Sequence, residues 1–544
     1  MRFLLDVFDL HKNCVVCQDR RCESKPLTVI STGCRSIDIF YGGDMIQGYA
    51  TSEATAALAG KQATMTYVPF GKTGLMTSQA GFGCYRISPE VAHHGRSLRQ
   101  ALLSGINLID TSTNYTDGDS EALVGSVLAE VIEAGGMRRE ELVVVSKVGY
   151  LQGKNYAGSQ ARRSANQPFP ELVTVSEGLE HCIHPEFIAS QLTESLNRLG
   201  LATIDAYLLH NPEYYLGWAH QSGMEPDAAR REYHRRIWQA FVHLESEVAQ
   251  GRIRWYGVSS NTFPAAQTDP EFTGLSALWE MAEDIRPDHH FRIIQFPMNL
   301  LETGAALVAN QPGSKTVLEF ADDHRLAVMI NRPLNAFSGN ALVRLAEPEE
   351  PERLADHLIT ARIGAVGGSE SRFWRHMLPA LEIPDGIKLR LKEQLCIADT
   401  LKHYWRNFSS YERWRQTRDG HFYPRIQGVM MFLQPHAAGN PELLKWMSTH
   451  ETVLSEVFEA IGSFYAEMLR RRITELKRAL ADADSDWAAP GTLSQKAIRA
   501  LRTTRGISVV LVGMRHPGYV EDVLEELRRP FPVMDRKKAW QDLK

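Results

Sequence analysis

Residues 106–115 read Ile106-Asn107-Leu108-Ile109-Asp110-Thr111-Ser112-Thr113-Asn114-Tyr115, a short apolar run that stops at polar side chains. Two later runs have the same form: Leu142-Val143-Val144-Val145-Ser146-Lys147 and Ile204-Asp205-Ala206-Tyr207-Leu208-Leu209-His210. In a parallel barrel the C-terminal ends of all strands meet at one face, and catalytic residues gather there. The pattern therefore predicts that four ionisable residues converge on one site: Asp110, Tyr115, Lys147 and His210.

Each of these residues also has an ordinary interpretation when it is taken alone. Loops carry most polar side chains, so a single Tyr or Lys after a strand is usually a solvated loop residue. A single His after a strand is more often a satisfied hydrogen-bonding group than a catalyst. Four such residues at strand ends, in the order expected of a barrel, are much harder to obtain by chance.

Composition indicates a globular enzyme rather than a nucleic-acid or membrane protein. The chain has 544 residues, of which 44% are hydrophobic and 23% charged, so it can bury a large core. The net charge of −5 gives no electrostatic reason to expect nucleic acid. No apolar run approaches the roughly 18 residues of a membrane helix. The early Asp6 interrupts any secretory apolar region, and seven cysteines without framework spacing fit a reducing compartment, so we expect a cytoplasmic location.

Residues 1–64 differ from the rest of the chain, with four of the seven cysteines (Cys14, Cys17, Cys22 and Cys34) and no sustained period. Thiolates in such pairs can hold zinc, but the second pair lacks the short spacing of a zinc ribbon. We therefore expect no metal site. The segment is interpreted as a poorly structured extension, or as sequence upstream of a natural start at Met65.

From residue 65 onward, strand-like and helix-like runs alternate. Helical periodicity covers residues 95–103, 121–133, 185–199, 234–250 and 273–284. Strand-like runs cover residues 80–84, 106–110, 142–147, 204–210, 253–259, 292–296, 326–331 and 507–513. Eight strands in this alternation predict an α/β fold, a closed (β/α)8 TIM barrel rather than an open sheet. A bare barrel needs roughly 250 residues, so sizeable additions are also expected.

Two segments exceed ordinary connections. Residues 149–178 are rich in Gly, Ser and Asn, and we expect a long loop that lies over the substrate. A larger helical insertion separates the seventh strand from the eighth, with apolar spacing over 387–405, 441–447 and 453–481. We predict barrel segments 65–335 and 492–530 around an insertion at 336–491.

The insertion contains a series of tryptophans and a basic cluster. The tryptophans are expected to form the core of a helical subdomain, with a ligand cleft as the alternative: Trp374, Trp405, Trp414, Trp446 and Trp487. The basic run at 470–472 is interpreted as a solvated helix face. We expect residues 335–345 to touch a cofactor pyrophosphate through Asn335, Ser338 and Gly339. The rest of the insertion is either a cap that shapes the substrate pocket or a dimerisation or stability element.

The four strand-end residues resemble the Asp/Tyr/Lys/His tetrad of the aldo-keto reductases. The resemblance implies Tyr115 as general acid, Lys147 as the group that lowers its pKa, Asp110 as the partner of Lys147, and His210 as substrate orienter. The chemistry is consistent, because a free Tyr has a pKa near 10 and a neighbouring cation favours its ionised form. A His within hydrogen-bonding reach can position the carbonyl oxygen. The opening segment, Phe70-Gly71-Lys72-Thr73-Gly74-Leu75, resembles the family hairpin that closes the barrel floor.

Further stretches resemble the nicotinamide-binding parts of this family. Residues 251–261 end in Ser259-Ser260-Asn261, where an extra Ser separates the expected Ser-Asn pair, and residues 294–299 supply the matching Gln295. The resemblance implies the following cofactor-binding residues: Ser259, Asn261, Gln295, Arg332, Leu334, Gly513, Arg515 and Asp522. Asn331 replaces an aromatic stacking residue, and Arg515, Asp522 and Val523 replace the usual grip on the 2′-phosphate and adenine. The resemblance implies NADP as the cofactor, and Arg515 is able to meet a phosphate bidentately. Because the usual phosphate-gripping residues are replaced, NAD is kept as the alternative.

The sequence thus predicts an NAD(P)-dependent oxidoreductase that interconverts a carbonyl (aldehyde, ketone or sugar) and an alcohol, with Tyr115 as general acid/base. Two alternatives remain, since fold alone does not fix function. One is a nicotinamide-binding regulatory or interaction subunit with little turnover, and the other is an inactive barrel kept for its interactions. A small-molecule substrate is the expected partner, without nucleic acid or membrane, and the oligomeric state is left open.

Overall fold

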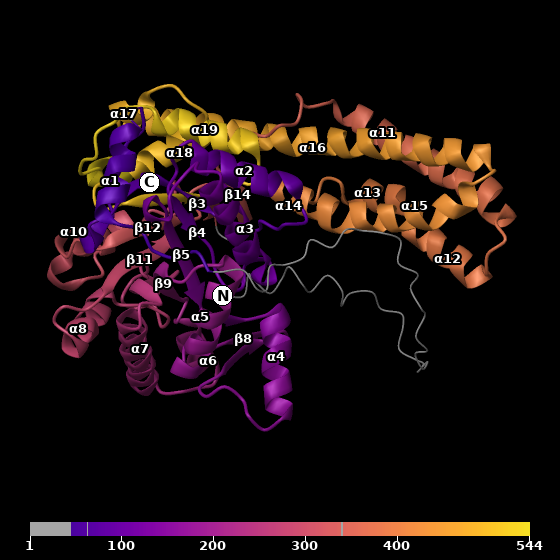
Figure 1. The fold of residues 1–544 in the computed structure, drawn as a ribbon. Helices are drawn as coiled ribbons and strands as arrows, with labels where there is room; N and C mark the ends of the chain where they lie inside the picture. Colours follow the sequence, from indigo (N-terminus) through magenta and orange to yellow (C-terminus); the bar gives the residue numbers. More distant parts are fainter. Residues whose placement is uncertain (1–44, 63, 339–340, 544) are drawn as a thin grey trace. The chain divides into compact units, whose positions relative to one another are not determined.

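The computed structural model describes residues 45–62, 64–338 and 341–543. The four N-terminal cysteines and Gly339 lie outside these residues. Eight parallel strands form a closed barrel in the order β10-β11-β12-β15-β3-β4-β5-β9, with helices on the outside (Figure 1). The strands are β3 (Ala80–Gly83), β4 (Leu108–Asp110), β5 (Val143–Val148), β9 (Ile204–His210), β10 (Ile253–Ser259), β11 (Phe291–Pro297), β12 (Ala327–Asn331) and β15 (Val509–Val512). The predicted TIM barrel is confirmed.

Burial on both faces explains why these strands were visible as apolar runs. Every residue of β5 and of β9 is buried. Strands of a parallel barrel face side chains inside and helices outside, so they read as nearly continuous hydrophobic segments. β12 pairs directly with β15, with Met329 opposite Val509, although more than 150 residues separate them in the chain. The large insertion therefore leaves barrel closure intact.

Amphipathic helices connect successive strands of the barrel. In α5 (Pro185–Leu199), His184 caps the N-terminus through its side chain, Pro185 occupies the first turn, and Gly200 ends the helix in the left-handed region. The other outer helices are α2 (Ala92–Leu103), α3 (Asp119–Glu133), α7 (Pro226–Ala249), α8 (Leu275–Ile285), α10 (Val317–Asp323) and α19 (Pro517–Leu527). Shorter helices are α6 (Tyr214–Gln221) and α9 (Gly304–Leu307).

A hairpin closes the barrel floor, as the resemblance implied. β1 (Tyr67–Pro69) pairs antiparallel with β2 (Met76–Ser78). Phe70 and Leu75, from the turn between these strands, join the hydrophobic cluster inside the barrel together with Ala50.

The prediction that residues 1–64 lack regular structure is wrong for their described part. α1 (Ser52–Lys61) begins with a side-chain cap by Thr51, and Ile46 pairs with Leu201. The Ala50 N–H donates to Asp205 Oδ1 at 2.7 Å, and this carboxylate also pairs with the buried Arg139. Such long-range contacts leave no period in the local sequence, which explains why the segment was misjudged.

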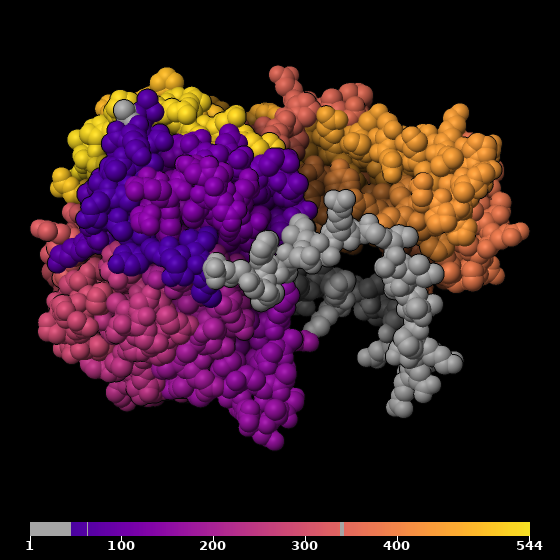
Figure 2. Space-filling model, in the orientation of Figure 1, coloured from indigo at the N-terminus to yellow at the C-terminus, as the bar shows by residue number. Residues whose placement is uncertain are grey.

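The segment after β5 is not the simple long loop that its composition suggested. It contains α4 (Gly153–Ser164) and a three-stranded antiparallel sheet of β6 (Tyr150–Leu151), β8 (Leu179–His181) and β7 (Val173–Ser176). The purple segment that includes α4 protrudes from the barrel unit at the lower edge of the view (Figures 1 and 2). The buried Glu180 organises this segment, because its carboxylate accepts from Ser159, Gln160 and Arg163.

Residues 299–302, 333–500 and 538–544 make up a second compact unit. It begins with the hairpin of β13 (Asn335–Ser338) and β14 (Ala341–Arg344) and continues with α11 (Asp356–Arg372), α12 (Asp385–Gln394), α13 (Ile397–Tyr404), α14 (Tyr411–Thr417), α15 (Tyr423–Ala437), α16 (Pro441–Ala483), α17 (Ser485–Ala488) and α18 (Leu493–Arg502), with α20 (Lys537–Leu543) at the end. Two helix predictions need correction: 387–405 is split between α12 and α13, whereas 441–447 and 453–481 join into the continuous α16.

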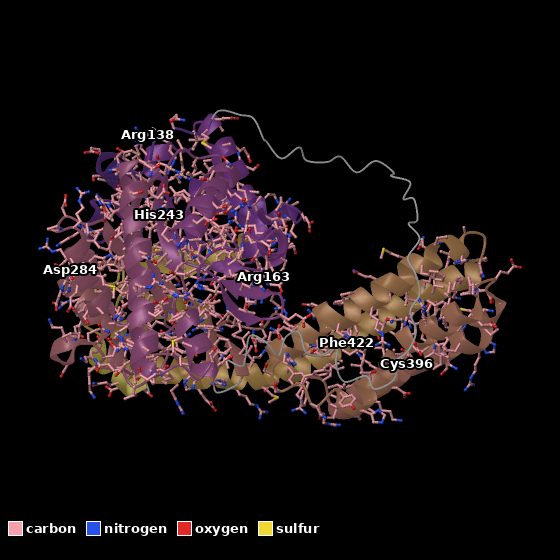
Figure 3. The ribbon with its side chains drawn as sticks, turned by 90° about the horizontal axis from the view of Figure 1, so that it is seen from below. Arg138, Arg163, His243, Asp284, Cys396 and Phe422 are labelled. Atoms are coloured by element: carbon pink, nitrogen blue, oxygen red, sulfur yellow. The ribbon has the colours of Figure 1, made fainter. Side chains whose placement is uncertain are left out.

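The tryptophans of the second unit are mainly core residues. Trp405, Trp414, Trp446 and Trp487 are all buried, and Trp446 stacks on Phe373. Phe422, labelled in Figure 3, is also buried and packs against Phe458. This confirms the core interpretation for these four residues, while Trp374 is half-buried. None of the helices in the described part of the chain is long and apolar enough to cross a membrane.

Candidate active site

The four predicted catalytic residues meet at the C-terminal face of the barrel, around Lys147. The Lys147 Nζ donates to Asp110 Oδ2 at 2.8 Å, to the Tyr115 hydroxyl at 3.1 Å and to the Thr111 carbonyl at 2.8 Å. Asp110 ends β4, and Lys147 lies near the end of the neighbouring β5. A buried ammonium therefore joins the carboxylate to the phenol.

The Lys147–Asp110 ion pair is buried, and further hydrogen bonds fix its geometry. Lys147 is 0% exposed and Asp110 is 3% exposed. Burial disfavours the charged ammonium, but the nearby Asp110 and Tyr115 outweigh it and raise the pKa of Lys147. The other carboxylate oxygen, Asp110 Oδ1, accepts from Gln295 Nε2 at 2.9 Å. Both oxygens of Asp110 thus have donors, and Lys147 stays charged at neutral pH.

The pKa of Tyr115 differs in direction from the sequence expectation. Burial raises it to about 12 even though Lys147 lowers it, because desolvation of the phenolate is the larger effect. The expected lowering by Lys147 is therefore present but does not set the net direction. The ring lies at the start of a short turn in which Thr116 and Asp117 have positive φ. Tyr115 is accordingly a protonated phenol at neutral pH.

His210 lies beside Tyr115 as a neutral imidazole. Its ring makes edge contacts with Tyr115 at 6.0 Å and with Tyr150 at 4.7 Å between centroids. Burial, followed by the charge of Lys147, places the pKa of His210 well below its usual range. The Nδ1 atom lies 3.1 Å from the Ser112 hydroxyl.

The segment after β5 contacts both the ring and the backbone carbonyl of His210. The buried His181 of β8 places its Nε2 at 2.8 Å from the His210 carbonyl oxygen. Burial lowers the pKa of His181 to about 4, so this ring is a neutral donor. Asn211 Nδ2 donates to the Tyr150 hydroxyl at 2.6 Å. At Gly149 an added Cβ would lie 2.5 Å from the His210 carbonyl oxygen, so only glycine permits this close approach.

Two of the predicted cofactor-binding residues lie directly next to the tetrad. Ser259 Oγ donates to Gln295 Oε1 at 3.0 Å, and the amide of Gln295 reaches Asp110. Asn331, at the end of β12, contacts the same Gln295 oxygen at 3.4 Å through Nδ2. The ends of β10, β11 and β12 therefore present hydroxyl and amide groups side by side.

Asn261 has a different position from Ser259. Its side chain is exposed, and its backbone N–H donates to Glu213 Oε1 at 2.8 Å. Ser260 is turned into a buried network with Thr262 and Thr273. The extra Ser thus separates the two members of the expected Ser-Asn pair, and no contact of the Asn261 side chain with the tetrad is present among the described residues.

The remaining predicted cofactor residues are spread over three places. Arg332 follows β12 with a positive φ of 53°. Leu334 belongs to the second compact unit, where its carbonyl accepts from the Leu345 N–H. Gly513 and Arg515 follow β15, whose end pairs with β3, and Asp522 lies in α19. Their binding roles, and that of residues 335–345, stay predictions.

Sequence reasoning missed the residues that surround His210. Ser112 and Asn114 lie inside the run that first indicated the site, and their small polar side chains were a visible signal. Tyr150 and His181 lie in the segment interpreted as a loop, and only its sheet brings them to His210.

Comparison with known proteins relates the part of the chain that carries these residues to a known family. Residues 77–271 match the family model described as the aldo/keto reductase family, and this range contains Asp110, Tyr115, Lys147 and His210. This part of the chain is therefore an aldo/keto reductase domain.

The relatives are distant. The chain is 30% identical over 154 residues to the NADH-specific methylglyoxal reductase of Escherichia coli, covering 27% of this chain and 42% of that protein. It is 22% identical over 351 residues to an aldo/keto reductase of Synechocystis, covering 62% and 85%. It is 29% identical over 153 residues to a protein of Schizosaccharomyces pombe named as a voltage-gated potassium channel subunit beta, covering 27% and 37%. The alignments thus span less than half of the first and third relatives.

Solved structures give similar matches. The glycerol dehydrogenase of Gluconobacter oxydans has 18% identity and a TM-score of 0.42, covering 88% of this chain and 95% of that one. An aldo/keto reductase of Klebsiella pneumoniae, solved with NADP and acetate, has 22% identity and a TM-score of 0.30, covering 50% and 69%.

Proposed function

We propose that this protein is a nicotinamide-dependent oxidoreductase that interconverts a carbonyl and an alcohol, with Tyr115 as general acid/base. One observation carries the proposal. The buried Lys147 Nζ joins Asp110 to the Tyr115 hydroxyl, at 2.8 and 3.1 Å, on the face of the barrel where strand ends meet. A buried ammonium placed against a phenol has a clear chemical use, because it stabilises the phenolate that forms when the proton leaves.

Tyr115 and its neighbours are suited to proton transfer in both directions of the reaction. Tyr115 keeps its proton at neutral pH and is therefore able to donate it to a developing alkoxide. In the opposite direction the Tyr115 oxygen receives the alcohol proton, with Lys147 holding the charge nearby. His210 lies within edge contact of Tyr115 and is suited to hydrogen-bond the substrate oxygen. A bound nicotinamide would supply or accept the hydride.

The strand ends beside the tetrad fit the polar part of such a cofactor. Ser259, Gln295 and Asn331 offer hydroxyl and amide groups of the kind that pair with a carboxamide. We propose NADP as the cofactor and NAD as the alternative. Arg515 is suited to a phosphate group by its guanidinium, whereas the E. coli relative is named as NADH-specific.

Replacing Tyr115 with Phe tests the proposal. The ring and its contacts with Tyr85 and His210 remain, but the acid proton is lost. We expect kcat to fall about 10²–10⁴-fold, the usual contribution of general acid catalysis. Nucleotide affinity, measured by fluorescence titration with NADPH and NADH, should stay within about 3-fold. Retained turnover in the variant across a panel of aldehydes, ketones and sugars would remove Tyr115 from this role.

A regulatory subunit is the second candidate function. The observation in its favour is the S. pombe relative named as a channel subunit, together with a second compact unit of about 180 residues that offers room for a partner surface. The two functions differ in a simple measurement. Tight nucleotide binding with no turnover of any carbonyl or alcohol would favour the regulatory function, whereas turnover lost in the Tyr115→Phe variant favours the enzyme.

A further inference from the structure

The backbone that directly follows Tyr115 has an unusual conformation. Thr116 and Asp117 have φ values of 48° and 57°, and Gly118 has a φ of 92°. Glycine adopts this left-handed region freely, but residues with a Cβ rarely do, and β-branched residues such as Thr least of all. Backbone of this kind persists only where surrounding contacts hold it. One such contact fixes Thr116, whose hydroxyl donates to the Ile87 carbonyl at 2.8 Å.

The start of α4 contacts the Tyr115 turn on both sides of the tyrosine. The backbone N–H of Lys154 donates to Asp117 Oδ1 at 2.8 Å. The side chain of Gln152, directly before the helix, donates to the Asn114 carbonyl at 3.3 Å. The residue before Tyr115 and the second residue after it are therefore both attached to α4.

Asp117 serves as the N-terminal cap of α4, although it lies in a different segment. The first N–H groups of a helix have no partner within the helix, and a carboxylate is favoured beside them by the helix dipole. Gln152, which occupies the N-cap position, makes no side-chain cap. Gly153 has a φ of 54°, and an added Cβ there would overlap the Asp117 carboxylate. The contact between Asp117 and α4 is thus close, and it requires glycine at position 153.

The helix that holds Asp117 is itself fixed to the barrel. Three of its side chains donate to the buried carboxylate of Glu180 in β8: Ser159, Gln160 and Arg163. His181, the next residue of β8, places its Nε2 at 2.8 Å from the His210 carbonyl oxygen. Direct contacts therefore run from the Tyr115 turn through α4 and β8 to the end of β9. The turn is attached to a structured segment rather than to a free loop.

We propose that Asp117 is a positioning residue, which holds the turn of Tyr115 through α4 and so fixes the Tyr115 hydroxyl against the Lys147 ammonium. These two groups lie 3.1 Å apart. A relaxed turn would lengthen this distance, and the cation would then stabilise the phenolate less. The inference rests on the proposed function and adds residues 149–181 to it, as the part of the chain that sets the geometry of proton transfer.

Kinetics of two Asp117 variants test the proposal. Glycine adopts the left-handed backbone freely, so Asp117→Gly removes the carboxylate without straining the turn. We expect kcat to fall about 10–100-fold, as for a reacting group misplaced by about 1 Å, while KM and the Kd for NADPH stay within about 3-fold. Asp117→Asn keeps an oxygen that accepts from Lys154 and should restore most of kcat. An equal loss of kcat in Asp117→Asn and Asp117→Gly would overturn the proposal.

Two further variants test the same contact from its other side. Gly153→Ala leaves the Tyr115 turn unchanged but drives a Cβ into the Asp117 carboxylate, so it should lower kcat in the same way. Asp119→Asn is the matched control, because the Asp119 carboxylate also faces Lys154, in a largely exposed ion pair at 3.6 Å, without capping α4. We expect its kcat within about 2-fold of wild type, since such pairs contribute little. An equal loss in Asp119→Asn would assign the effect to surface charge and refute the inference.

A double-variant cycle tests whether Asp117 acts through Tyr115. In the Tyr115→Phe background the acid proton is already absent, so adding Asp117→Gly should lower the remaining activity by less than about 2-fold. A further loss as large as that in the wild-type background would show that Asp117 acts on a different group, and the positioning role would be wrong.

A measurement without substrate separates this inference from the proposed function. Labelling of tyrosine at ¹³Cζ gives signals for 17 tyrosines, and Tyr115→Phe identifies the signal of Tyr115. This signal responds to the nearby charge of Lys147, so we expect it to shift in Asp117→Gly and to stay in place in Asp117→Asn and Asp119→Asn. An unchanged signal in Asp117→Gly refutes the inference, even if activity falls. If no alcohol or carbonyl turns over, the proposed function fails, while this spectrum still decides whether Asp117 positions Tyr115.

Discussion

Replacing Lys147 with Met should destabilise the barrel by about 3–5 kcal/mol, the usual effect of removing one partner of a buried ion pair. Lys147 is fully buried, and its ammonium group donates three hydrogen bonds to protein acceptors, at 2.8, 2.8 and 3.1 Å. Methionine fills a similar volume, so cavity formation adds little. The main effect is a buried Asp110 carboxylate whose only other hydrogen-bond donor among the described residues is Gln295. Activity should also fall, about 10²–10⁴-fold, because the phenolate loses its cation.

A double variant separates stability from catalysis. In Asp110→Asn/Lys147→Met the buried charge is gone, so most of the lost free energy of unfolding should return while activity stays low. Because the chain forms two compact units, urea denaturation is best followed by hydrogen exchange of the amides of β5 and β9. The reasoning is refuted if the Lys147→Met variant is within about 1 kcal/mol of wild type in this assay, since a buried unpaired carboxylate cannot be that inexpensive.

Two further predictions concern stability. His181 has a pKa of about 4 in the folded protein against about 6.5 when unfolded, so its contribution is complete above pH 6.5 and is lost as the pH falls to 4. We expect a loss of about 3 kcal/mol over this window that His181→Gln reduces, as seen by urea denaturation at each pH; an identical pH profile in the variant would contradict this assignment. A chain that starts at Met65 should unfold about 2–4 kcal/mol more easily, because Leu58 and Ala50 leave the core and Asp205 loses the Ala50 N–H. Thermal denaturation at an unchanged midpoint would show that α1 adds nothing.

The sequence by itself determined the barrel and the identity of its four central residues. Strands that are buried on both faces must be apolar along their whole length, so β5 and β9 were visible without any tertiary information. Because parallel strands share one C-terminal face, the polar residues that follow them were bound to converge. The contacts of Lys147 with Asp110 and Tyr115 follow from that geometry.

Other features were decided only by the tertiary structure. The Ser112–His210 contact joins residues 98 positions apart, and the His181–His210 contact joins two different sheets, so no local period records either of them. The net rise in the pKa of Tyr115 depends on how completely the barrel excludes water, which composition does not reveal. Residues 149–178 look like a polar loop because their sheet is small and partly exposed. Strand ends are set by local burial, whereas the protonation and orientation of the groups between them are set by neighbours from distant parts of the chain.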